Sequence, residues 1–159
     1  MATGNGDFNR NAGGSQWGDS ILKLGPSLGV LDFFTPYDQS FLNNNDQDLG
    51  GGGPMPLPPI SGPIPDLLVE EGKAPTLFLV NRDKMGEYTP GGPDDVVQEL
   101  QNVVGPNHGL KGGPGYYVSP SGQPVVLYCG GDDALKAFAV LTSPMTALSL
   151  IGQTAMTFH

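Results

Sequence analysis

The chain has 159 residues, of which 25 are glycine and 16 are proline. So many helix-breaking residues exclude an architecture of long helices and favour one domain of short strands joined by turns, with a modest core. The formal net charge of −9, from 16 acidic and 7 basic residues, argues against nucleic acid or an anionic membrane surface as a partner.

The sequence also indicates where the protein would reside. No apolar run approaches the roughly 20 residues that a membrane helix needs. The N-terminal stretch MATGNGDFNRNAGG lacks the charged and apolar regions of a secretory signal. As written, the chain is expected to be cytoplasmic, with no membrane partner.

The first predicted elements are two strands, SILKL (20–24) and LGVLDFF (28–34), joined by a Gly-Pro turn. A long segment rich in Gly, Pro and Asn follows over residues 36–66, and we interpret it as an irregular loop. Within it, MPLPPI can form only an edge strand or a polyproline-like stretch, because proline lacks the backbone donor that a central strand needs.

Residues 67–81 carry two apolar runs, LLV and TLFLV, which predict a hairpin. TLFLV has no polar alternation, so both of its faces should be buried. The acidic pair Glu70–Glu71 between the runs is assigned to a solvated turn. The next stretch, residues 94–105, leaves two alternatives open: a helix that Asp95 would cap, or a valine-rich outer strand.

The C-terminal part predicts a second hairpin, from GYYVS (115–119) and PVVLYC (124–129) around a Pro-Ser-Gly-Gln turn. Residues 132–141 favour a helix on propensity alone. We nevertheless predict a strand there, because a related stretch near the N-terminus, GDSILKLG, is short and bounded by glycine. TALSLIG (146–152) predicts the last strand.

A short motif occurs twice in the chain. Gly-Asp is followed by a lysine four positions after the Asp, in the pairs Asp19–Lys23 and Asp132–Lys136. LFLVNRDKMGEY reads as a degenerate third copy. Repeated units of about 40–50 residues with four short strands are typical of β-propeller blades. The motif is then expected to join the second and third strands of each blade.

Several stretches together resemble the pyrroloquinoline-quinone-type β-propeller repeat proteins, which are quinoprotein-dehydrogenase-like. They are ATGNGDFN, WGDSILKL, FTPYDQSFLNNNDQDLGGGGPMPLPP, LFLVNRDKMGEYTPGGPDDVVQEL and GQPVVLYCGGDDALKAFAV. The resemblance covers almost the whole chain, and DQDLG…LP and NRDKMG are its most specific parts. It implies an all-β fold, a partial propeller of four-stranded antiparallel blades with a long Gly/Pro-rich loop. The implied organisation of the single domain 1–159 is the outer half of one blade (1–35), the loop (36–66), a second blade (67–105) and a third blade (106–159).

The resemblance also implies what the chain lacks. The quinone site of the true dehydrogenases is built from many blades and usually includes an adjacent cysteine pair, whereas this chain has only Cys129. Cys129 is interpreted as a small buried residue. Trp17 is a candidate for a blade-interface or cofactor-contacting tryptophan, with a packing role as the alternative. Pyrroloquinoline quinone is expected only in a complete propeller, and a longer family member would be periplasmic or secreted.

Three residues suggest a metal site in the long loop. Asn44, Asp46 and Asp48 stand at alternate positions, as oxygen ligands often do in calcium loops. No bidentate glutamate follows at the twelfth position of such a loop, so a solvated polar loop is the alternative reading.

A serine hydrolase is a further alternative, with Ser20 of the Gly-Asp-Ser trio as the nucleophile. A base would have to come from His108 or His159, and neither has local support. The acidic pair Asp94–Asp95 is assigned to a solvated turn, and PMPLPPISGPIP could act as a proline-rich ligand.

The function expected from the sequence is a structural or binding module that assembles through propeller blades, without a complete catalytic site. A quinone- and calcium-dependent oxidoreductase, completed by further blades or by oligomerisation, and a small hydrolase acting through Ser20 are the alternatives. Two or three blades cannot close into a ring, so exposed sheet faces and edges predict a homo-oligomer or further blades as partners.

Overall fold

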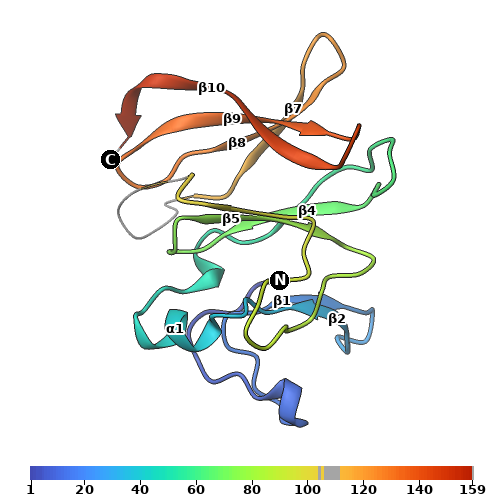
Figure 1. Cartoon of the computed structure of the whole chain (residues 1–159), viewed down its shortest axis with the longest axis vertical. Helices are drawn as coiled ribbons and strands as arrows, with labels where there is room; N and C mark the ends of the chain where they lie inside the picture. Colours follow the sequence, from blue (N-terminus) through green and yellow to red (C-terminus); the bar gives the residue numbers. More distant parts are fainter. Residues whose placement is uncertain (104, 106–111, 159) are drawn as a thin grey trace.

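The computed structural model describes residues 1–103, 105 and 112–158, so His108 and His159 lie outside the described residues. Within them the regular structure is mainly β, in three antiparallel sheets of two, four and four strands. Figure 1 shows these sheets as layers, with the first at the bottom and the third at the top. The all-β prediction is confirmed, and the propeller arrangement stays a prediction.

The first sheet is the hairpin of β1 (Ile21–Leu24) and β2 (Val30–Phe34), which confirms the two strands predicted there. The turn between them is closed by the Gly25 N–H, which donates to the carbonyl of Gly29 at 2.8 Å. A short 3-10 helix, η1 (Arg10–Ala12), precedes this sheet.

The segment 36–66 has more regular structure than expected. It contains the helix α1 (Gln39–Asn44), the 3-10 turn η2 (Leu49–Gly51) and the strand β3 (Met55–Pro56). β3 lies at the edge of the second sheet, where a proline costs no ladder hydrogen bond. The second sheet therefore begins inside the segment that the sequence marked as a loop.

The rest of the second sheet is β4 (Leu67–Glu71), β5 (Thr76–Asn81) and β6 (Gln98–Gln101), in the order β3-β4-β5-β6. The hairpin predicted for 67–81 is confirmed. In the described part of 94–105 the regular element is the strand β6, so the outer-strand alternative is the one observed.

The third sheet follows chain order and contains β7 (Gly115–Val118), β8 (Pro124–Tyr128), β9 (Asp133–Leu141) and β10 (Ala147–Phe158). The hairpin of β7 and β8 is confirmed, and its turn has Gly122 in the left-handed region at φ 83°. β9 confirms the strand predicted over 132–141 against the helix propensity of its residues.

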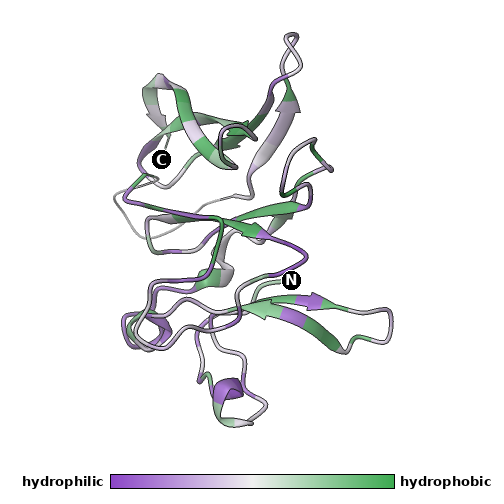
Figure 2. Cartoon of the chain, turned by 45° about the vertical axis from the view of Figure 1, so that its right-hand side comes forward, coloured by the Kyte–Doolittle hydropathy of each residue, from purple (hydrophilic) through white to green (hydrophobic). Residues whose placement is uncertain are grey.

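Two apolar layers hold the three sheets together. One lies between the second and third sheets and includes Leu67, Val69, Leu77, Leu79, Val126, Tyr128, Phe138 and Val140. The other lies between the first and second sheets and includes Ile21, Phe34, Leu49, Leu68, Phe78, Val80 and Met85. Because side chains alternate along a strand, β5 contributes to both layers, which confirms that TLFLV is buried on both faces. Figure 2 shows the hydrophobic residues gathered on the strands, whereas η1 is mainly hydrophilic.

The repeated Gly-Asp motif has one backbone conformation in both places. Asp19 and Asp132 have φ of 48° and 56°, in the left-handed region that Asp tolerates better than most residues. Asp132 joins β8 to β9, the second and third strands of its sheet, as predicted. The prediction is wrong for the degenerate third copy. Its NRDKMG stretch follows the third strand, β5, whereas residues 72–75 join the second strand, β4, to β5.

Candidate functional site

Ser20, the candidate nucleophile, is fully buried between the first sheet and the N-terminal segment. Its Oγ donates to the carbonyl of Gly18 at 3.0 Å and shares a 2.7 Å hydrogen bond with Thr35 Oγ1. Neither partner is a general base. The geometry describes a hydroxyl that fastens the Gly-Asp-Ser turn to the end of β2.

Asp19, the neighbour of Ser20, connects this turn to the long segment. Its Oδ1 accepts from the Leu49 N–H at 3.1 Å, and its Oδ2 accepts from Gln39 Nε2 at 3.3 Å. Burial raises the pKa of this carboxyl, and the two hydrogen bonds oppose that shift. Sequence reasoning missed this role, although the Gly-Asp repeat marked the position.

The predicted calcium ligands Asp46 and Asp48 lie beside a lysine of the β4–β5 connection. Lys73 Nζ is 3.1 Å from Asp46 Oδ2 and 2.5 Å from Asp48 Oδ2, while Asn5 donates to the other oxygen of each carboxylate. The hydrogen bond from Lys73 lowers the pKa of Asp48. Asn44 is the last residue of α1. Among the described residues no cluster of three or more His, Cys, Asp or Glu side chains could hold a metal ion, and calcium binding stays a prediction.

The assignment of Glu70 and Glu71 to a solvated turn is wrong, because both residues belong to β4 and are almost completely buried. Both oxygens of Glu70 and one oxygen of Glu71 lack a hydrogen-bond partner of good geometry among the described residues, and the Gly53 backbone near Glu70 only partly opposes the effect of burial on its pKa. Burial raises the pKa of Glu70 to about 9, helped by the charge of Glu71, and burial raises the pKa of Glu71 to about 8. Both carboxyls are therefore protonated at neutral pH. Within the part of the chain that the structure describes, the buried Tyr128 hydroxyl also lacks a partner, and burial raises the pKa of this hydroxyl well above the usual value.

A second acidic group lies near α1. Asp94 Oδ1 accepts from the Tyr37 N–H at 2.7 Å, and burial raises the pKa of Asp94 to about 7, with the charges of Glu99 and Asp38 adding to the shift. Asp95, in contrast, is exposed and pairs with Lys84 at 2.9 Å. The predicted acidic pair thus divides into one half-buried and one solvated carboxylate.

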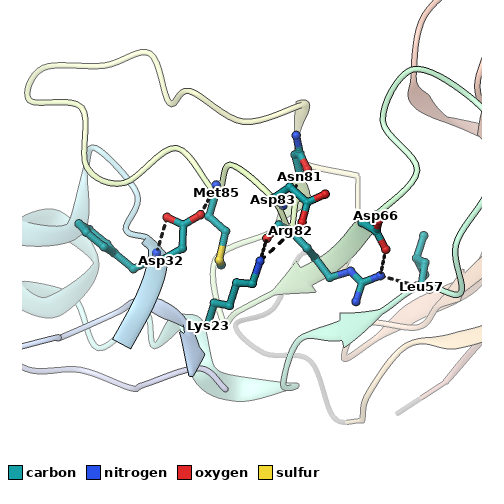
Figure 3. A network of polar contacts seen from close by, with 9 residues as sticks. Lys23, Asp32, Leu57, Asp66, Asn81, Arg82, Asp83 and Met85 are labelled. Atoms are coloured by element: carbon teal, nitrogen blue, oxygen red, sulfur yellow. Dashed lines mark hydrogen bonds and ion pairs between the residues drawn. The ribbon is translucent and has the colours of Figure 1, made fainter. Parts of the chain in front are cut away.

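The NRDKMG stretch joins the first sheet to the second through polar contacts (Figure 3). Lys23 Nζ donates to the carbonyl of Arg82 at 2.7 Å, and Asp32 Oδ2 accepts from the Met85 N–H at 3.0 Å. Arg82 in turn donates to Asp66 Oδ1 at 2.6 Å. The NRDKMG stretch, one of the most specific parts of the resemblance, therefore connects the first sheet to the second.

Trp17 lies in a group of half-buried aromatic side chains on the first sheet, which we call the aromatic end. Its ring centre is 5.0 Å from that of Phe33 and 6.5 Å from that of Phe8, and Phe8 is 5.0 Å from Tyr88. The guanidinium of Arg10 lies 5.4 Å from the Trp17 ring centre. The packing role that the sequence offered for Trp17 is present, and its partly exposed ring leaves the interface role open.

The third sheet has one face that no other sheet covers within the described residues. Val126, Tyr128 and Phe138 face the second sheet, so alternation turns Leu127 and Leu135 to the opposite side. We call that side the open face. The hollow on it has a volume of about 400 Å³ and is lined by Gly112, Gly113, Gly115, Leu127, Cys129, Gly130, Leu135 and Phe158.

The aromatic rings at the edges of the open face are exposed to solvent, whereas the residues at its centre are buried. Tyr117 on β7 is 43% exposed and Phe158 on β10 is 42% exposed, while Val125 and Ala139 between them are buried. Cys129 is half-buried beside the hollow, and burial raises the pKa of its thiol, which opposes thiolate formation. The site combines an apolar floor with exposed aromatic rims.

Comparison with known proteins gave no match to a protein family, to a curated protein or to a solved structure. Among the described residues, no helix combines the length and the apolar character that crossing a bilayer requires.

Proposed function

We propose that this protein is a sheet-stacking assembly module of the quinoprotein-propeller type, without a complete catalytic site, which binds a further β-sheet on its open face. The observation that carries the proposal is that other sheets cover two similar strand pairs unequally, which leaves Leu127 and Leu135 only partly buried although Val125 and Ala139 beside them are buried. β4 and β5 have a sheet on each side, whereas β8 and β9 have one sheet, on the side of Val126 and Phe138. The sequences of both pairs lack the polar alternation of a half-solvated sheet.

The chemistry of the open face suits association. The residues that line its hollow include no charged side chain, and Tyr117 adds an exposed ring at its edge. Burial of a few hundred Å² of such surface contributes several kcal/mol at ~25 cal/mol per Å². Repulsion between chains acts against this, but salt screens it beyond ~8 Å at physiological ionic strength.

Light scattering after size exclusion tests the proposal over a range of protein concentrations. The wild-type chain should run above its monomer mass of 16.6 kDa and grow as concentration rises. Leu135→Lys and Tyr117→Lys, which place a charge on the open face, should return it to the monomer mass. Met145→Lys is the matched control, because Met145 is an apolar residue, 68% exposed, in the turn between β9 and β10. A wild-type chain that stays at 16.6 kDa at every concentration overturns the proposal.

The two enzymatic alternatives are tested separately. Pyrroloquinoline quinone with calcium, followed by absorbance, reports whether the assembled chain binds the cofactor. Ser20→Ala should leave any ester hydrolysis by the purified protein unchanged, because the Ser20 hydroxyl has a carbonyl and a hydroxyl as partners. Loss of hydrolysis in this variant would restore the hydrolase reading.

A further inference from the structure

The sequence contains a single Asn-Gly pair, Asn5–Gly6, in the N-terminal segment that runs beside the first sheet. An asparagine followed by glycine is especially prone to spontaneous deamidation, because glycine has no Cβ to keep its backbone nitrogen away from the asparagine side chain. Asn5 is exposed, and the Gly6 N–H makes no hydrogen bond with the described residues. The nitrogen that would attack is therefore not engaged in backbone pairing.

The Asn5 side chain is held by a contact that is easily broken. Its Nδ2 donates to Asp46 Oδ1 at 2.8 Å, and both residues are exposed. Asp46 keeps the Lys73 ammonium as a partner at 3.1 Å, so its charge stays compensated when the amide turns away. Polar contacts at a surface contribute little to stability, because water replaces them. The Asn5 amide carbon is therefore able to turn towards the Gly6 nitrogen.

The reaction needs only the chain and solvent water. The Gly6 nitrogen forms a bond to Cγ of Asn5, and the Cγ–Nδ2 bond breaks, so that Nδ2 leaves as ammonia with the proton that the Gly6 nitrogen gives up. The cyclic succinimide then takes up a water molecule at either of its carbonyl carbons. Opening at Cγ gives aspartate with the original backbone. Opening at the main-chain carbonyl carbon gives isoaspartate, in which the main chain runs through the side-chain carbons and is longer by a methylene group.

The two products fit the fold differently, because the backbone is held in register on both sides of the Asn-Gly pair. On one side the Asp19 N–H donates to the Gly4 carbonyl at 2.9 Å. On the other side the Gly18 N–H donates to the Asp7 carbonyl at 2.9 Å. Aspartate keeps the spacing between these two hydrogen bonds, whereas isoaspartate lengthens the main chain between them. The isoaspartate product therefore cannot keep both hydrogen bonds with their present geometry.

The longer backbone has no room to bulge towards the first sheet. A Cβ on Gly18 would lie 1.9 Å from the Gly6 carbonyl oxygen, so the two backbones are already in close contact there. The same carbonyl accepts from Nε2 of the buried Gln39 at 2.8 Å. The added methylene therefore displaces the residues that follow, and among these Phe8 forms an antiparallel β-bridge with Trp17.

We propose that Asn5 is a site of spontaneous deamidation, and that its isoaspartate product releases the pairing between Phe8 and Trp17. This release loosens the aromatic end, because Phe8 packs on three other rings of that group. The aspartate product keeps the pairing and places a new carboxylate beside Asp46. The inference is independent of the proposed function, because other residues line the hollow of the open face.

Peptide mapping by mass spectrometry, after incubation of the folded protein in mildly alkaline buffer, tests the modification. Residue 5 should gain the mass of an amide-to-acid conversion, and isoaspartyl methyltransferase should transfer labelled methyl groups to the incubated protein. Asn11 and Asn102 are internal controls, because both are exposed and are followed by alanine and valine, whose side chains hinder the attack. Asn5→Gln should take up far less label, because glutamine would have to close a larger ring. An intact amide at residue 5, under conditions in which the unfolded chain is converted, overturns the proposal.

Tryptophan fluorescence and thermal unfolding test the consequence. Trp17 is the only tryptophan of the chain, so its emission reports the aromatic end directly. The emission should shift to the red in proportion to the isoaspartate content, because release of Phe8 exposes the Trp17 ring to water, and the melting temperature should fall. Asn5→Asp is the control for the new charge, since it has the carboxylate without the longer backbone, and its emission should match that of fresh wild-type protein. Isoaspartate formation with unchanged emission and melting temperature overturns the release of the pairing. An equal red shift in Asn5→Asp also overturns it, because charge alone would then explain the change.

Discussion

Two groups of acidic residues near the C-terminal end of β4 are accommodated by the fold in opposite ways. Asp46 and Asp48 are near the surface, and Lys73 supplies a positive charge between them. Glu70 and Glu71, just before that lysine in the chain, are buried with oxygens that have no partner among the described residues. The exposed pair is neutralised by an ion pair and the buried pair by protons. The difference shows that distance from solvent, and not the number of acidic residues in a stretch, decides how a carboxylate is accommodated.

The largest expected effect is a loss of stability with rising pH. The pKa of Glu70 in the folded chain is about 9, against an ordinary value of 4.5. Between these values the folded chain holds a proton that the unfolded chain has lost. The stabilisation by this proton is complete below pH 4.5 and is lost as pH rises towards 9, at roughly 1.4 kcal/mol per pH unit. Denaturant unfolding at pH 5, 7 and 9 measures this slope.

Glu70→Gln should remove most of that slope, because glutamine resembles the protonated acid at every pH. The variant should be more stable than the wild type at pH 9 and of similar stability at pH 5. Glu87→Gln is the matched control, since Glu87 is exposed. Equal slopes in the wild type and in Glu70→Gln would show that Glu70 is ionised in the folded chain.

Glu71→Gln should have a smaller effect of the same sign. Its pKa is about 8, because the charge of Lys136 partly offsets the effects of burial and of Asp133. The window of pH-dependent stability for this group therefore ends about one pH unit earlier. The same three-pH unfolding series checks it, and a larger loss of pH dependence in Glu71→Gln than in Glu70→Gln would reverse the order of the two pKa values.

Asp19 extends the comparison to a buried carboxylate that does have hydrogen-bond partners. Asp19→Ala removes the acceptors of the Leu49 N–H and of Gln39 Nε2 and should cost about 1–3 kcal/mol, the usual effect of leaving buried donors unpaired. Asp19→Asn should cost less, because asparagine keeps one acceptor and tolerates the left-handed backbone. Thermal unfolding of both variants measures the difference, and an equal loss in the two would mean that the charge of Asp19 is what matters.

The strands could be predicted from the sequence because their signals are local. TLFLV and PVVLYC show apolar runs bounded by turn residues, and both formed the strands expected. The position of Glu70 and Glu71 could not be predicted in this way. A sequence window shows two acids beside a Gly and a Pro, whereas β4 extends through them because sheets lie on both of its sides.

The candidate site was harder to predict because its contacts join distant parts of the chain. Asp46 and Asp48 gave the pattern of a calcium loop, but Lys73 is 27 residues beyond Asp46 and gave no sign that it would lie beside them. Trp17 was marked as an interface candidate, and its neighbours Phe8 and Phe33 come from two other segments. The open face follows from which strands stack on which, and this depends on the whole fold.

The smallest expected effect tests the exposed half of the comparison. Lys73→Met removes the positive charge from Asp46 and Asp48 and should lower the melting temperature only slightly, because exposed ion pairs contribute little. It should also raise the pKa of Asp48, which Lys73 now lowers. The two carboxylates are then free to share an added cation, so millimolar calcium should stabilise Lys73→Met more than the wild type. Lys84→Met is the matched control, because Lys84 is an exposed lysine paired with one carboxylate, Asp95. If calcium stabilises the wild type and Lys73→Met equally, the lysine and the cation do not compete, and Asp46 and Asp48 are not calcium ligands.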